Sequence, residues 1–289
     1  MSRVARRSSK NARPSSEGGE KHPALPGGVA VVCTGTRVMP ESLTIGMLAL
    51  IALIAYGTSL FHSVGGFAGG LLLAICLAPI LGVKATIPVT ATAMVVSNVT
   101  RVWVFRHAID WRVFSAVFLV ALPGIVVGAV LYIELPAHWV ALLLGLFLIV
   151  TVPLRRYVNK RNYRVGLNGL RVAAVPYGLI SGTTMGAGLM LAPFLLGAGL
   201  TGVRLIAVVA ALGLGLNLTK TAVFGFSPLL TTELAFTGLL IGLCTIPGAY
   251  TGRWVVNHTP IRIHTVFMEG LILSGAAYFL WIATSDLIS

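Results

Sequence analysis

The sequence contains few charged residues: Asp, Glu, Lys and Arg together make up only 10% of its 289 residues. A soluble globular domain needs roughly a quarter of its residues charged to cover its surface. Here 56% of the residues are hydrophobic, and the mean hydropathy is +0.92. The composition therefore excludes an ordinary soluble protein and predicts a membrane protein whose surface lies mostly in lipid.

Residue patterns typical of enzymes are also missing. The three cysteines, Cys33, Cys76 and Cys244, lack the spacing of a metal site, and the apolar segments hold no cluster of His, Glu and Asp. Neither a Gly-x-Ser-x-Gly elbow nor a phosphate-binding loop occurs. We therefore expect no enzyme, no metal, no cofactor and no ATP-driven transport by this chain alone.

Acidic residues are especially rare: the chain has eight against 21 Lys and Arg, which gives a net charge of +13. Six of the basic residues crowd the loop 155–171, which contains no acid, and seven precede the first apolar run. Lys and Arg gather in the cytoplasmic loops of membrane proteins. Topology thus explains their placement, so we expect no nucleic-acid partner and predict that the loop 155–171 is cytoplasmic.

Apolar runs begin at Leu43 and follow one another to the end of the chain. They lie at about 43–61, 67–83, 85–105, 113–133, 137–153, 172–184, 187–201, 203–224, 234–256 and 263–283. A membrane crossing needs about 20 apolar residues, so we predict an all-α, multi-pass protein of the inner cell membrane. Its predicted parts are a disordered basic tail (1–41), a first transmembrane repeat (42–154), the basic cytoplasmic loop (155–171) and a second transmembrane repeat (172–285).

The second half of the chain repeats the first. Asn-Val-Thr-Arg at 98–101 returns as Asn-Leu-Thr-Lys at 217–220, and Pro-Gly at 123–124 returns at 247–248. Ordered matches of this kind indicate two copies of one module. With five segments in each half, the copies would be inverted relative to each other. A rival model makes the broken segments re-entrant, which gives about four crossings per half and a cytoplasmic tail.

Several motifs together resemble a known family. Gly-Gly-Phe-Ala-Gly-Gly at 65–70, Thr-Ala-Thr at 90–92 and Ile-Asp-Trp-Arg at 109–112 are similar to the sulfite exporter TauE/SafE family, as is the glycine-rich stretch 182–193. The resemblance covers about 43–284. It implies a membrane protein that exports sulfur-containing anions such as sulfite or sulfoacetate.

Two short stretches, 62–79 and 178–193, are broken by Gly and Pro at matching places of the two halves. Broken backbone at membrane depth is tolerated where it lines a cavity, and secondary transporters place their substrate there. Half-helices that begin near Gly70 or Gly188 would direct free N–H groups at an anion. The alternative is that these glycines only allow close helix packing. The glycines predicted to bind substrate are Gly66, Gly69, Gly70, Gly186 and Gly188.

The duplicated polar motifs supply the other candidate ligands. Asn98 lies three residues before Arg101, and Asn217 three before Lys220, so on a helix each pair shares a face. A cation beside an amide donor suits an oxyanion. The alternative is that both cations extend to the membrane surface as topology anchors. The neighbouring hydroxyls, Thr100 and Thr219, complete the predicted substrate-binding set.

Two residues are candidates for proton coupling. Glu269 lies about two turns inside an apolar segment, where a carboxylate is costly unless it is protonated or paired. His62 lies at the break of the first segment and can also carry a proton. Structural alternatives are a pairing of Glu269 with His264 or a serine, and a merely hydrogen-bonded His62.

These features favour a secondary transporter that exports small sulfur oxyanions or organosulfonates by alternating access, coupled to a proton, to sodium or to the membrane potential. The alternatives are a passive anion channel and a non-transporting membrane scaffold. The sequence leaves the substrate, the coupling ion and the oligomeric state open.

Overall fold

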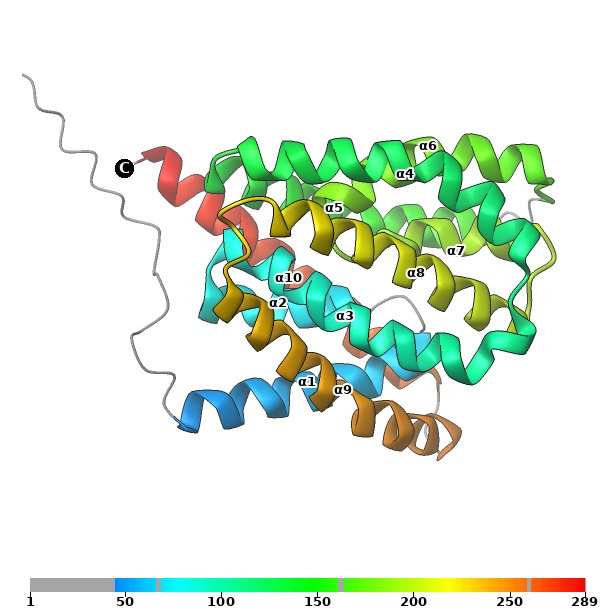
Figure 1. The fold of residues 1–289 in the computed structure, drawn as a ribbon, viewed down its shortest axis with the longest axis horizontal. Helices are drawn as coiled ribbons and strands as arrows, with labels where there is room; N and C mark the ends of the chain where they lie inside the picture. The colour runs from blue at the N-terminus through cyan, green and yellow to red at the C-terminus, as the bar shows by residue number, and fades with distance from the viewer. Residues whose placement is uncertain (1–44, 66–68, 161–163, 259–260, 289) are drawn as a thin grey trace, which may run out of the picture. The chain divides into compact units, whose positions relative to one another are not determined.

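Helices follow the predicted apolar segments one for one. The computed structural model describes residues 45–65, 69–160, 164–258 and 261–288, and all regular structure in these residues is helical. The predicted tail, 1–41, lies outside them. The described residues form ten α-helices (Figure 1): α1 (Ile45–Gly65), α2 (Gly69–Leu81), α3 (Val83–Phe105), α4 (Trp111–Glu134), α5 (Ala137–Lys160), α6 (Leu167–Thr183), α7 (Gly188–Gly197), α8 (Gly202–Gly225), α9 (Thr232–His258) and α10 (Ile261–Ile288).

Among the described residues, three helical stretches are long and apolar enough to cross a membrane. They are Val83–Ala108, Trp111–Glu134 and Gly202–Gly225. Shorter apolar stretches lie within α1, α2, α5, α7, α9 and α10. The all-helical prediction and the membrane assignment are thus both supported by the fold.

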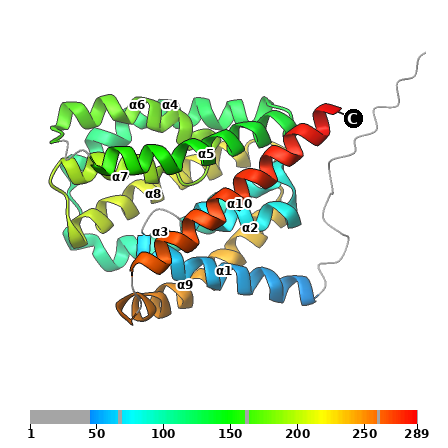
Figure 2. The same ribbon diagram turned by 180° about the vertical axis from the view of Figure 1, so that it is seen from behind.

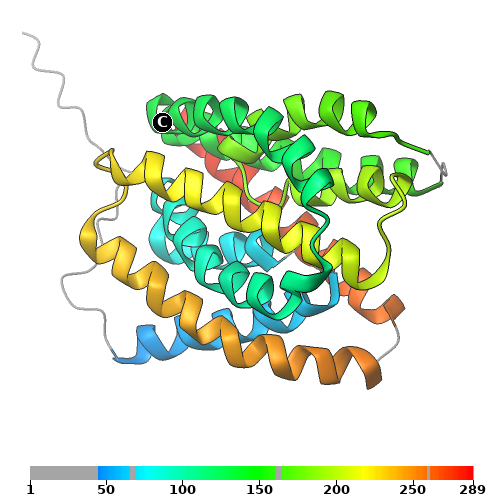
Figure 3. The same cartoon turned by 45° about the vertical axis from the view of Figure 1, so that its right-hand side comes forward.

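The helices pack in pairs that are far apart in the sequence. α4 packs against α6 and α1 crosses α9 (Figure 1), while α10 packs obliquely against α5 (Figure 2). α3 packs against both α8 and α9, and α8 also contacts α4 (Figure 3). Each half therefore packs mainly against the other half, which places residues of both halves around the centre.

Glycines bring two of these pairs into backbone contact. A Cβ atom on Gly182 of α6 would lie 2.7 Å from Gly128 Cα and 2.8 Å from Ala129 N of α4. A Cβ atom on Gly248 of α9 would lie 2.7 Å from Tyr56 O of α1. A Cβ atom on Gly124 of α4 would likewise lie 2.8 Å from Leu179 N of α6. Gly124 and Gly248, the glycines of the repeated Pro-Gly motifs, thus both lie at close helix contacts, as small residues do between membrane helices.

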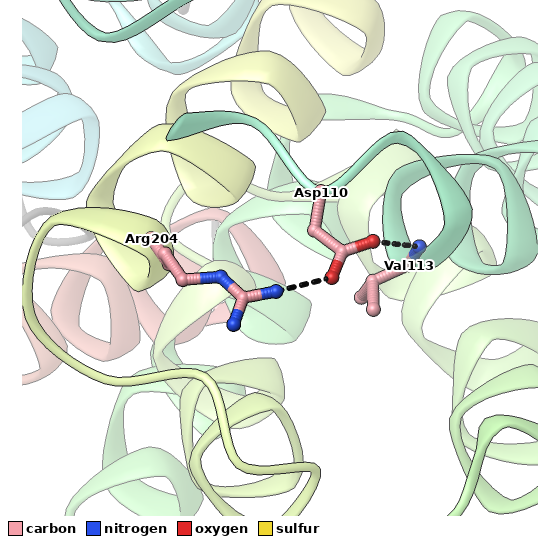
Figure 4. A network of polar contacts seen from close by, with 3 residues as sticks. All are labelled: Asp110, Val113 and Arg204. Carbon is pink, nitrogen blue, oxygen red and sulfur yellow. Dashed lines mark hydrogen bonds and ion pairs between the residues drawn. The ribbon is translucent and has the colours of Figure 1, made fainter. Parts of the chain in front are cut away.

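An ion pair joins the turn before α4 to the start of α8 (Figure 4). Asp110 caps α4, since its Oδ1 accepts from Val113 N–H at 3.2 Å, while its Oδ2 lies 2.9 Å from Arg204 Nη2. A carboxylate at a helix N-terminus satisfies a free N–H group and interacts favourably with the helix dipole. The Ile-Asp-Trp-Arg motif thus fixes where α4 begins.

α2 and α7 are the short helices that follow the two predicted breaks. α6 ends at Thr183 and α7 begins at Gly188, so residues 184–187 form a non-helical break. Gly186 within it has a φ of +84°, a left-handed conformation that favours glycine. In the first predicted stretch, α1 ends at Gly65 and α2 begins at Gly69, and residues 66–68 lie outside the described residues.

Candidate functional site

A cavity of about 80 Å³ lies where the second break meets α1, α2, α3, α6 and α8. A single water needs about 10–15 Å³ by a comparable measure, so this cavity has room for a small polyatomic anion. It brings together seven of the predicted residues: His62, Gly70, Asn98, Gly186, Gly188, Asn217 and Lys220. Both halves of the chain therefore contribute to one site.

Lys220 places a cation in the wall of this cavity. Its side chain is only 3% exposed, and its Nζ donates to Thr184 O at 3.1 Å and to Met185 Sδ at 3.3 Å. The described residues form no ion pair with it. Lys220 of α8 therefore reaches into the break between α6 and α7 and is buried within the protein. A buried cation without an acid is costly, and a bound anion would compensate its charge.

The start of α7 faces the same space. Leu189 N–H donates to Gly186 O at 3.0 Å and Met190 N–H to Ala187 O at 2.9 Å, which closes the first turn of the helix. Ala187 and Gly188 precede those amides and line the cavity. A ligand in the cavity would therefore meet the positive end of α7 at the N–H groups of Ala187 and Gly188.

The duplicated asparagines meet where α3 crosses α8. Asn98 Nδ2 donates to Met94 O at 2.8 Å and Asn217 Nδ2 to Gly213 O at 2.7 Å, so each amide bonds its own helix one turn back. A Cβ atom on Gly213 would lie 3.0 Å from the Asn98 carboxamide. Each carboxamide has two N–H groups and uses one of them within its own helix. One N–H group of each asparagine therefore remains to bind a ligand.

His62 contacts both the first residue of α2 and Arg101. Gly69 N–H donates to His62 Nδ1 at 3.0 Å, and Arg101 Nη1 lies 2.7 Å from His62 Nε2. A neutral imidazole accepts at only one nitrogen, so the two donors compete for the ring. Arg101 itself is half-buried and does not line the cavity. The two matched cations, Arg101 and Lys220, therefore have different surroundings.

The remaining predicted residues lie elsewhere or outside the described chain. Thr100 and Thr219 bond the carbonyls of Val96 and Gly215 in their own helices and do not line the cavity. Gly69 packs against His62. Gly66 and the side chain of Glu269 lie outside the described residues.

The sequence pattern predicted that the stretch 178–193 lines a cavity, but it did not single out the polar side chains at the end of α6. Tyr177, Ser181 and Thr184 line the cavity together with Met185 and, from α3, Met94. Tyr177 and Ser181 lie one turn apart on the same face of α6, and Thr184 follows directly after the last residue of the helix. That polar stripe in an apolar segment was a usable signal, whereas nothing in the sequence distinguishes the two methionines from core residues.

Comparison with known proteins agrees with these features. Residues 23–279, nearly the whole chain, match the model of the family described as sulfite exporter TauE/SafE. No curated protein and no solved structure matches the chain. The resemblance carried by the sequence motifs is thereby confirmed.

Proposed function

The chain belongs to the sulfite exporter TauE/SafE family, and we propose that it exports small sulfur-containing anions through the cavity at Lys220. Membership identifies it as a membrane protein of a transporter family whose name denotes sulfite export. The finer proposal is a secondary transporter of sulfite, sulfoacetate or related organosulfonates, spanning the inner cell membrane several times.

The buried Lys220 is the observation that carries this proposal. Of the three donors on an ammonium group, two face a backbone carbonyl and a thioether, and a thioether is a weak acceptor. An oxyanion that replaced Met185 Sδ would gain a charge-assisted hydrogen bond. The N–H groups at Ala187 and Gly188 and the spare N–H groups of Asn98 and Asn217 would bind its other oxygens.

Alternating access between two inverted repeats is supported by the way the helices pair. Exchanging α1–α5 with α6–α10 turns the pair α4–α6 into α9–α1 and the pair α3–α9 into α8–α4. The pairs α3–α8 and α5–α10 map onto themselves. In transporters built from such repeats, the substrate site lies between the repeats near the bilayer midplane. The cavity between α3, α6 and α8 would occupy that position.

Flux through proteoliposomes tests the proposed function. Vesicles that contain the purified protein should accumulate sulfite or an organosulfonate against its gradient when a proton or sodium gradient is imposed. Flux that only follows the anion's own gradient would indicate the passive channel. Inactivity together with stable co-purification of another protein would indicate the scaffold.

Topology gives a second expected result. In a variant without native cysteines, Arg164→Cys in the basic loop should react with a membrane-impermeant thiol reagent only from the cytoplasmic side, because Lys and Arg mark that side. Arg164 is exposed, so the thiol is reachable. Labelling of intact cells from outside would reverse the proposed orientation.

Coupling to protons is proposed to pass through His62. A proton on Nδ1 would break the bond from Gly69 N–H, so protonation and the position of the start of α2 are linked. His62→Gln is expected to keep slow flux down the anion gradient and to lose its response to an imposed pH gradient. If the flux of the variant responds to the pH gradient as wild type does, His62 does not carry the coupling proton. Glu269 or a sodium ion would then be the candidate for coupling.

A further inference from the structure

Three helical stretches that are long and apolar enough to cross a membrane have an end at one place on the molecule. The stretch Val83–Ala108 finishes, and Trp111–Glu134 begins, at the turn between α3 and α4. The third stretch, Gly202–Gly225, begins beside the same turn, because Arg204 in its first turn lies 2.9 Å from Asp110 (Figure 4). Helices that cross a membrane end near its surface, so this place lies at the level of the lipid headgroups.

Two exposed tryptophans lie at this level. Trp103 in the last turn of α3 is 69% exposed, and Trp111 at the start of α4 is 59% exposed. The Trp111 ring packs edge-on against Phe114 with 5.5 Å between the ring centroids. Tryptophan is enriched where a membrane meets water, because its ring is apolar and its N–H group is polar. Both rings are therefore placed to contact lipid at the membrane surface.

The charge at these three helix ends is positive. Arg106, Arg112 and Arg204 are all exposed, whereas the turn holds one acid, Asp110, which pairs with Arg204. The described residues give Arg106 and Arg112 no acidic partner. Two arginines therefore keep their full charge beside the exposed tryptophans.

The opposite ends of the same three helices lack this excess. Lys84 in the first turn of α3 and Glu134 in the last turn of α4 supply one charge of each sign, and the last turn of α8 holds no charged residue. The basic loop 155–171, by contrast, approaches the positive end: Val165 N–H donates to Gly197 O at 2.9 Å, and Gly197 ends the helix that leads into α8. The turn thus lies on the side that the basic loop marks.

The side chain of Arg106 is oriented and still has donors for a ligand. Its guanidinium lies 4.6 Å from the centroid of the Trp103 ring, and Nη1 donates to Trp103 O at 2.8 Å. A guanidinium has five N–H groups, so this bond leaves several of them unused. Arginine binds phosphate through two parallel N–H···O bonds. Arg106 and Trp103 therefore present a phosphate donor and an apolar ring side by side.

We propose that the turn 106–112 binds the headgroup of an anionic phospholipid. Arg106 and Arg112 bind its phosphate group, and the rings of Trp103 and Trp111 lie against its glycerol and upper acyl chains. A lipid fits better than a soluble phosphate compound, because both rings are exposed where helices enter the membrane. None of these residues lines the cavity at Lys220, so the inference does not depend on the proposed transport function.

Lipid binding to the purified full-length protein in neutral detergent tests the proposal. Phosphatidylglycerol and phosphatidylcholine with the same acyl chains are titrated, and the first bound lipid is measured by native mass spectrometry. An arginine near an anionic headgroup contributes about fivefold in affinity, so wild type should prefer phosphatidylglycerol by about tenfold or more. The preference should fall to about one in Arg106→Gln/Arg112→Gln. Arg164→Gln/Arg171→Gln removes the same charge from exposed positions and should keep the preference.

Three outcomes would overturn the proposal. Equal binding of both lipids by wild type would show that no anionic headgroup is selected. Equal loss of preference in the two double variants would assign the effect to overall surface charge. Displacement of phosphatidylglycerol by an equal concentration of glycerol 1-phosphate would assign the site to a soluble phosphate compound.

A second measurement locates the lipid without changing an arginine. Bromine atoms on an acyl chain quench the fluorescence of nearby tryptophan, so brominated phosphatidylglycerol should quench wild type more strongly than brominated phosphatidylcholine. This difference should disappear in Trp103→Phe/Trp111→Phe. If it persists, the lipid binds elsewhere and the assignment to this turn is wrong.

Discussion

Replacement of Lys220 with methionine is expected to weaken anion binding by roughly 10- to 150-fold, because hydrogen bonds to charged groups contribute about 1.5–3 kcal/mol. The folded protein should remain at least as stable as wild type. Lys220 is buried without an acidic partner among the described residues, and removing such a charge in favour of an apolar side chain of similar size relieves its desolvation. Anion affinity and thermal unfolding, measured in the same detergent, give both quantities.

Lys84 offers a matched control for this variant. Its Nζ donates to Tyr132 O at 2.8 Å and Ile133 O at 2.9 Å, which satisfies carbonyls in the last turn of α4, and it does not line the cavity. Lys84→Met should therefore lower stability and leave anion affinity unchanged. If Lys220→Met binds anions as wild type does, the site is not at Lys220, and Arg101 becomes the next candidate.

Gly182→Ala is expected to reduce the folded fraction severely. The added methyl group would collide with Gly128 Cα and Ala129 N, which are backbone atoms and cannot rotate away. Overpacking typically costs about 1–3 kcal/mol, and we expect the upper end of this range or more. The yield of monodisperse protein and its thermal unfolding measure the effect.

Gly57→Ala is the control for that substitution. A Cβ atom on Gly57 of α1 meets nothing within 4 Å, so the gain in helix propensity of about 0.8–1 kcal/mol should make this variant slightly more stable. Equal stability of Gly182→Ala and wild type would show that α4 and α6 are further apart than their glycines indicate.

The helices were predictable because lipid demands long apolar runs, and such runs are visible in one sequence. Their ends were less so. α5 continues to Lys160 and α10 to Ile288, beyond the apolar segments at 137–153 and 263–283. Lys and Arg, which occur in the last part of α5, are good helix formers outside the membrane, so apolarity alone marks the end of α5 too early.

The site was predictable only where the repeat pointed to it. The repeat identified Asn98 and Asn217, and the cavity contains both. It also assigned equal roles to Arg101 and Lys220, yet only Lys220 lines the cavity. The difference comes from tertiary packing. Arg101 contacts the His62 side chain of α1, whereas Lys220 contacts Thr184 O in the break after α6. A sequence match cannot report such asymmetry.

The contacts between helix backbones divide the described helices into groups by how freely they can shift. Helices whose main chains touch cannot slide past each other without first separating. The glycines of α9 touch backbone atoms of α1 and α3, including Tyr56 O, Val89 O and Ala93 O, and those of α6 touch α4. By contrast, α8 meets its neighbours at Gly213 and Gly215 through the side chains of Asn98 and Phe118. We therefore expect α1–α3–α9 and α4–α6 each to move as a rigid body, with α8 and its lysine as the adjustable surface between them.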